Sequence, residues 1–186
     1  MRTRALATTA LLLTVVTGCG DDGAAPAVEP SEPAASSEAP SPSVTRAQAA
    51  IGHAFRAFAR GGPLPRLADD VDLYLGNAFT GVVTRPRARD RRAWATCTEL
   101  GAYAARTCPL SPLVVLRQHA RVSYADRPQG LCMPTYSPVP PDLRKLERVV
   151  IVPAEGSIEM CAQNFAIQLF TDRGELVAVS TLIGEP

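Results

Sequence analysis

The spacing of apolar residues predicts a helix shortly after a proline-rich stretch near the N-terminus. Ile51, Phe55 and Phe58 recur at i, i+4 and i+7, which places them on one face of a helix. Upstream, the segment 45–48 fits a capping box, in which a threonine hydroxyl and a glutamine side chain satisfy free backbone N–H groups. Two glycines and a proline at 61–63 are typical of a helix end. The helix is therefore expected to fill the interval from 45 to 60.

The segment after this helix has the two-residue repeat of a strand. Residues 68–76 alternate between apolar and polar side chains, the pattern of a half-buried strand. One face carries Val71, Leu73 and Leu75, and the other carries Asp70, Asp72 and Tyr74. We expect the first face to pack inward and the second to face solvent.

The rest of the chain predicts two further helices and then a run of strands. Helices are expected around 99–106 and 111–116, the latter because serine suits the cap and proline suits the first helical position. Strands are expected at 121–125, 148–153, 164–171 and 176–183, with a proline-rich crossing loop at 134–141. Asp172–Glu175 contains a glycine and predicts a hairpin turn between the last two strands. On the third of these strands Phe165, Ile167 and Leu169 should point inward, and on the last Val177, Val179 and Ile183 should share one face.

Helices first and a strand meander last predict an α+β domain. The expected architecture has N-terminal helices packed on a four- to five-stranded antiparallel sheet, whose apolar face they cover.

The first eighteen residues have the pattern of an export signal. A basic start at 1–4 precedes Ala5–Gly18, 14 residues without a charge and too few to span a bilayer. The segment Val16-Thr17-Gly18-Cys19 resembles the lipobox of bacterial lipoproteins: an aliphatic residue, two small residues and an obligatory cysteine. The resemblance implies cleavage before Cys19 and lipidation of its sulfur, and two or more acyl chains give a stable membrane anchor. The alternative is an ordinary signal peptide followed by an incidental cysteine.

The composition then divides the chain into three parts. Residues 1–18 form the signal, and residues 19–44 form the lipidated cysteine and a linker rich in Ala, Pro, Ser and Glu that cannot bury enough apolar surface to fold. Its prolines favour an extended spacer, with a proline-rich recognition tract as the alternative. Residues 45–186 form a single domain of 142 residues.

The net charges of the domain and the linker limit the kinds of partner that we expect. The domain carries a net charge of about +4 and the linker about −5. This mild balance in an exported chain does not predict binding to nucleic acid, and no second apolar run is long enough for a transmembrane helix. The expected location is the extracytoplasmic face of the cell membrane. The expected partners are the membrane itself, through Cys19, and a cell-envelope polymer or protein.

Four cysteines remain after Cys19. An even number in an exported domain predicts two disulfides, and three pairings are possible. We favour Cys132–Cys161 and Cys97–Cys108. The second pair requires a kink, because eleven residues of continuous helix would separate its ends by about 16 Å, whereas a disulfide needs Cα atoms within about 7 Å. No CxxC spacing is present and neither histidine lies in a zinc pattern, so no metal or other cofactor is expected.

Few residues suggest catalysis. Asp70, Asp72 and Tyr74 share one strand face and form the best constellation, in which a carboxylate would act as a general base. The remaining acid–base candidates are Asp69, His53, His119 and Tyr124. The chain has no Gly-x-Ser-x-Gly elbow, glycine-rich phosphate loop or HExxH motif. The simpler interpretation is a solvent-facing strand side, and a non-catalytic role is favoured.

An arginine-rich segment from 85 to 92 suggests anion binding. Its guanidinium groups match phosphates or carboxylates on lipid headgroups or wall polymers. The arginines are Arg85, Arg87, Arg89, Arg91 and Arg92. The alternative is a solvated loop. Trp94, the single tryptophan, is expected to anchor the core.

The segments 55–60, 140–149 and 161–174 read Phe-x-x-Phe-Ala-Arg, Pro-Pro-x-Leu-Arg-x-Leu-x-Arg-Val and Cys-x-x-x-Phe…Leu-Phe-x-Asp-x-Gly. With the lipobox and linker, they make the chain similar to secreted actinobacterial lipoproteins, a group that implies no activity. A looser resemblance, over 55–61 and 67–74, is to the NTF2-like or cystatin-like cone folds. Two hypotheses follow. The chain is a surface module that binds a ligand or protein, or it is a small NTF2-like enzyme that uses a strand carboxylate.

Overall fold

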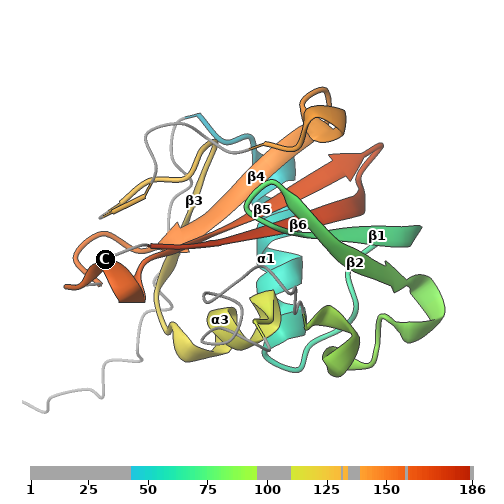
Figure 1. Cartoon of the computed structure of the whole chain (residues 1–186), viewed down its shortest axis with the longest axis horizontal. Coiled ribbons are helices and arrows are strands. Elements are labelled where there is room, and N and C mark those ends of the chain that lie inside the picture. The colour runs from blue at the N-terminus through green and yellow to red at the C-terminus, as the bar shows by residue number, and fades with distance from the viewer. Residues whose placement is uncertain (1–42, 96–109, 131, 134–138, 158, 185–186) are drawn as a thin grey trace, which may run out of the picture. The chain divides into compact units, whose positions relative to one another are not determined.

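The computed structural model of this chain describes residues 43–95, 110–130, 132–133, 139–157 and 159–184. Within them lie two α-helices, α1 (Arg46–Ala59) and α3 (Pro112–Gln118), and one six-stranded sheet (Figure 1). The predicted α+β class is confirmed. The helix expected at 99–106 and most of the crossing loop at 134–141 lie outside the described residues.

Helix α1 begins and ends where its sequence predicts. The Gln48 N–H donates to the Thr45 hydroxyl at 3.2 Å, and the Thr45 N–H donates to the Gln48 side-chain oxygen at 2.9 Å, which completes the capping box. Val44, just before the cap, is also buried with the core, so core packing includes at least one residue upstream of the cap. Gly61 follows the helix at φ +109°, a conformation that favours glycine.

The sheet has the strand order β2-β1-β6-β5-β4-β3. Its strands are β1 (Leu67–Leu75), β2 (Ala78–Thr84), β3 (Val122–Ala125), β4 (Glu147–Pro153), β5 (Phe165–Asp172) and β6 (Glu175–Ile183). Two details differ from the expected four- to five-stranded antiparallel sheet. The sequence analysis missed β2, and β1 pairs with β6 in parallel. The long chain between these two strands supplies the connection that a parallel pair needs.

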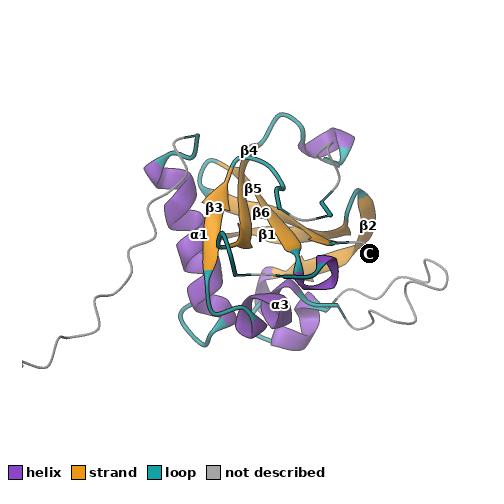
Figure 2. Ribbon diagram, turned by 90° about the vertical axis from the view of Figure 1, so that its left-hand side faces the viewer, coloured by secondary structure: helices purple, strands orange, loops and turns teal. Residues whose placement is uncertain are grey.

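One face of the sheet carries the main core, together with both helices (Figure 2). Phe55 of α1, Leu116 of α3 and Ile151 of β4 are each fully buried in one cluster with the apolar face of β1. Trp94 is also fully buried, with its ring centroid 5.5 Å from that of Phe55, so its predicted role as a core anchor is confirmed. Fully burying an aliphatic side chain contributes about 1.5–3 kcal/mol, so this cluster dominates the stability of the fold.

The hairpin between β5 and β6 forms at the predicted turn. Arg173 and Gly174 have φ of 48° and 77°, the positive values that a two-residue hairpin loop requires. Just beyond the turn the pairing shifts between Phe170 and Thr171. The shift brings Leu176 into the main core and puts Val177 on the opposite face, so the expectation that Val177 shares a face with Val179 is wrong.

The second face of the sheet is also covered. Met133 packs on a cluster from β3, β4, β5 and β6, and Leu143 joins another with Tyr74 and Phe170. Residues predicted to face away from the core are therefore buried, as Ala166 and Gln168 show with no exposed surface. We call the described residues that cover this face, 132–133 and 139–146, the covering segment. The Cys132–Cys161 disulfide, with a Cα–Cα distance of 5.3 Å, ties it to the residues just before β5. That predicted pairing is confirmed, while Cys97 and Cys108 lie outside the described residues.

Candidate functional site

A charged side chain interrupts the apolar pattern on the covered face of β4. Alternation along this strand places Arg148 on the same side as the buried residues Val150 and Val152. Across the sheet, Arg148 pairs with Phe170, Phe170 with Ala178, and Ala178 with Asp72. One row of side chains therefore has a cation near one end and a carboxylate near the other.

Hydrogen bonds fix the orientation of Arg148. Its Nη1 donates to the Gln168 side-chain oxygen at 3.0 Å, and its Nη2 donates to the Asp126 backbone carbonyl at 2.6 Å. Burial lowers the pKa of the guanidinium, an effect that the nearby Asp126 opposes. The group remains charged at neutral pH because arginine starts from so high a pKa. A half-buried cation is therefore held in one place beneath the covering segment.

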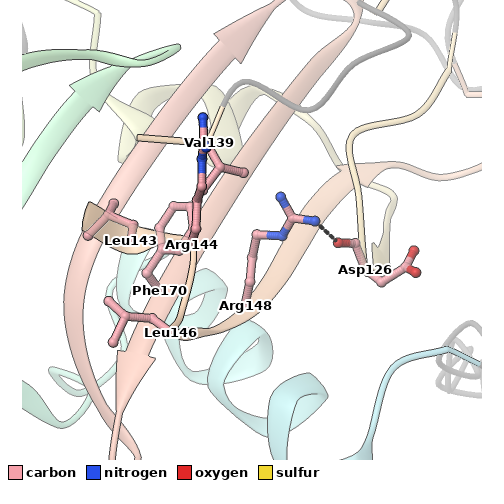
Figure 3. Close-up of a pocket in the computed structure, with 7 residues that line it drawn as sticks. All are labelled: Asp126, Val139, Leu143, Arg144, Leu146, Arg148 and Phe170. Atoms are coloured by element: carbon pink, nitrogen blue, oxygen red, sulfur yellow. Dashed lines mark hydrogen bonds between the residues drawn. The ribbon is translucent and has the colours of Figure 1, made fainter. Parts of the chain in front are cut away.

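A pocket of about 300 Å³ opens beside this guanidinium (Figure 3). Its wall contains four apolar side chains, Val139, Leu143, Leu146 and Phe170. Arg144, Arg148 and Asp126 complete the lining. In Figure 3 the apolar side chains lie to one side of the Arg148 guanidinium and Asp126 lies to the other. An apolar wall beside fixed polar groups is the usual composition of a small-molecule site.

The predicted carboxylates lie at the far end of the same face, outside this lining. Asp70 is exposed, Asp72 is half-buried, and Tyr74 is 7% exposed with its ring edge-on to Phe79. Burial, and then the charge of Asp70, raises the pKa of Asp72. Burial, and then the charges of Asp72 and Asp142, raises the pKa of Tyr74. The three predicted residues thus share a face, but Tyr74 packs against the covering segment instead of facing solvent.

The arginine-rich segment forms two short 3₁₀ turns, Arg85–Arg87 and Arg91–Trp94. Arg85 donates to the Leu67 carbonyl at 2.6 Å and lies 3.3 Å from the Asp69 carboxylate. The indole of Trp94 donates to the Ala88 carbonyl at 2.8 Å, which fixes the segment to the core. These contacts give part of the segment a structural role.

Two other arginines of this segment line a second pocket. It measures about 530 Å³ and is lined by Phe58, Gly62, Pro63, Leu64, Arg89 and Arg91. Arg89 and Arg91 are exposed, as are Arg87 and Arg92. The Arg91 guanidinium donates to the Phe58 carbonyl at a long 3.4 Å. Both cations of this second pocket are exposed to solvent. They should therefore attract an anion less strongly than the half-buried Arg148 of the first pocket does.

The histidines make local contacts on the helix side of the sheet. The His53 ring lies 4.4 Å from that of Tyr124, and its Nδ1 shares a 3.1 Å hydrogen bond with the tyrosine hydroxyl. His119 packs on Phe165 at 4.5 Å, and burial lowers its pKa. Within the described ranges, no three His, Cys, Asp or Glu side chains gather in a way that would hold a metal ion.

Sequence reasoning missed Arg144 and Arg148, the two cations of the first pocket. A usable signal was present, because Arg148 stands in phase with Val150 and Val152 at the start of an otherwise apolar strand. The partners of Arg148 could not be read from the sequence, since Asp126 and Gln168 lie on other segments of the chain.

Comparison with known proteins adds no assignment: no family model, curated protein or solved structure matches this chain.

Proposed function

We propose that this chain is a lipid-anchored protein of the extracytoplasmic membrane face whose folded domain binds a small ligand without catalysing a reaction. The observation that carries the binding role is the pocket beneath the covering segment. It combines an apolar wall with a guanidinium that two hydrogen bonds hold in position.

Two further observations support the proposed location. The leader ends in a lipobox-like sequence at Cys19, and the domain contains a disulfide between Cys132 and Cys161. Disulfides persist in oxidising compartments and are rare in the cytosol, so this bond fits an exported domain. Among the described residues, no helix has the length and apolar character needed to cross a membrane.

The composition of the pocket favours binding over chemistry. Of its lining residues, Asp126 carries the only carboxylate, and the other two charged groups are guanidinium groups, which do not give up a proton in proteins. General acid–base catalysis requires a group whose protonation changes near the working pH. The lining therefore provides orientation and attraction for a ligand, but little means of moving a proton.

Mass spectrometry of the protein extracted from membranes of an exporting host tests this proposal. The expected denatured mass is that of a chain starting at Cys19 with an attached diacylglycerol. Under native conditions, after exchange into a mild detergent, we expect a small molecule to be retained by wild type and lost when Val139→Asp is introduced into the pocket. A mature chain without lipid would contradict the anchor. A chain that never retains a small molecule, from any growth medium, would contradict ligand binding.

Asp72 supports a second candidate function, the NTF2-like enzyme. Its raised pKa, caused first by burial, brings the carboxylate closer to the range in which a general base works well. The neighbouring Tyr74 hydroxyl would be the partner group. Any turnover found in a substrate screen should fall at least a hundredfold in Asp72→Asn; turnover that survives this substitution would remove Asp72 as the base.

A further inference from the structure

Arginines gather near one end of the covered face of the sheet, and most of its carboxylates gather near the other. Arg148, Arg144 and the single carboxylate of Asp126 lie at the pocket. Asp72 and Asp142 lie near Tyr74, and Asp70 lies near Asp72. Asp72 and Arg148 stand three strands apart in one cross-strand row, or about 14 Å at the usual strand spacing. Because two arginines outnumber one carboxylate at the pocket, a negatively charged group is attracted to that end of the face and repelled from the other.

The apolar part of the wall lies between these two charged ends. Val139 and Leu146 are half-buried and pack on the buried cluster of Phe170, Leu143 and Tyr74, so the apolar part of the wall extends from Arg148 toward the acidic end. A molecule with its anionic group at Arg148 would lay its apolar part along this wall, away from the acidic residues. The reverse orientation would bring an anion toward carboxylates and leave Arg148 against the tail.

The size of the pocket limits the tail. At about 300 Å³ the pocket is at the lower end of the range for ligand sites, roughly 300–1,000 Å³. That space suits one short aliphatic chain and excludes the paired long chains of a bilayer lipid.

We infer that this pocket binds a single-chain anionic amphiphile, with its carboxylate or phosphate head at Arg148 and Arg144 and its aliphatic tail against the half-buried Val139 and Leu146, above the buried Leu143 and Phe170. The inference rests on the proposed function, because it names the ligand class of the same pocket. Arg148 supplies a positive charge that its hydrogen bonds to Gln168 and Asp126 hold in place, and the exposed Arg144 adds a second positive charge. Phosphate and carboxylate match a guanidinium equally in geometry.

Calorimetric titration of residues 20–186, the mature chain without its lipidated Cys19, tests the inference with defined probes. The probes are a straight-chain C8 carboxylate, the C8 primary alcohol and acetate. The carboxylate should bind at least about tenfold more tightly than the alcohol, because hydrogen bonds to charged groups are the stronger ones. Acetate should bind far more weakly, since each buried methylene contributes about fourfold in affinity.

Variants separate a head-group contact from a structural role of Arg148. Arg148→Met should weaken carboxylate binding by about tenfold or more and leave alcohol binding within about twofold. Val139→Asp should weaken both probes, and Val114→Asp on the exposed face of α3 is its matched control. Arg89→Met/Arg91→Met at the second pocket should change neither affinity.

The possible outcomes distinguish the inference from the proposed function. Equal affinity for alcohol and carboxylate, or an equal loss of both in Arg148→Met, would overturn the anionic head but keep a binding pocket. Binding only to vesicles of anionic phospholipid, abolished by Arg148→Met, would assign the site to a bilayer headgroup and also overturn the inference. If no probe binds and native mass spectra show no retained molecule, the proposed function fails with it.

Discussion

At the residue scale, His119 links the packing of the core to pH. Its ring is half-buried against Phe165, and burial lowers its pKa from the ordinary 6.5. The unfolded chain therefore binds a proton more readily than the folded chain as pH falls below about 6.5. The stability that the neutral ring contributes is complete above that pH and is lost as pH falls toward the lowered folded pKa. Wild type should lose more of its melting temperature than His119→Gln between pH 8 and pH 5; parallel pH profiles would contradict this.

Gly52 is a second residue at which a single packing contact should determine the effect of a substitution on stability. A Cβ at this helical position would lie 2.5 Å from a ring carbon of Tyr124, which is 1% exposed. Alanine would improve helix propensity by about 1 kcal/mol, but overpacking a buried ring costs about 1–3 kcal/mol. We expect Gly52→Ala to lower the free energy of unfolding by about 1 kcal/mol in urea denaturation. In a Tyr124→Leu background the clash is absent, so the same substitution should become stabilising. Destabilisation in both backgrounds would show that the tyrosine ring is not the cause.

At the scale of elements, the Cys132–Cys161 bond should hold the covering segment in place. The bond spans 29 residues, which corresponds to about 3–4 kcal/mol of stabilisation through restriction of the unfolded chain. The double variant Cys132→Ser/Cys161→Ser should lose about that much free energy of unfolding. It should also bind the C8 carboxylate more weakly, because Cys132 is followed by Met133, which packs on the covered face of the sheet. Reduced wild type should lose at least as much free energy of unfolding, because reduction also opens the predicted Cys97–Cys108 bond. An unchanged denaturation midpoint after reduction would contradict the role of the bond.

The helices and strands also show how much of the fold local sequence patterns can predict. Residue spacing predicts helix α1 and strands β1, β4 and β5. The turn at Arg173–Gly174 was predicted from its glycine, which favours a positive φ. Ser111 shows the limit of such reasoning: it occupies the cap position of α3, yet its hydroxyl is buried without the expected capping hydrogen bond. Strand β2 was missed because its exposed Phe79 and Val82 break the expected alternation.

The candidate site was harder to predict, because it depends on contacts between distant segments. Arg148 gains its fixed position from Asp126 and Gln168, and these contacts exist only after the sheet has formed. The carboxylates of β1 were found from alternation alone, but the covering segment that buries Tyr74 leaves no periodic signal. Sequence patterns therefore identified the faces of the strands and could not identify what covers them.

At the scale of the whole chain, the leader and the folded domain should act independently. Among the described residues, the first core member is Val44, 25 residues after Cys19, so the core contacts that the structure describes lie well away from the lipidation site in sequence. If the leader is a lipoprotein signal, Cys19→Ser should remove the acyl label, leave residues 1–18 attached and keep the melting temperature within about 1 °C. Acyl labelling and intact mass measure the first two effects, and Cys132→Ser/Cys161→Ser is the converse control, with lipid retained and stability lost. An ordinary secretory leader gives the opposite pattern: wild type without lipid, and Cys19→Ser still cleaved. Because the two variants alter anchoring and stability separately, a loss of both from Cys19→Ser alone would show that the domain needs its anchor in order to fold.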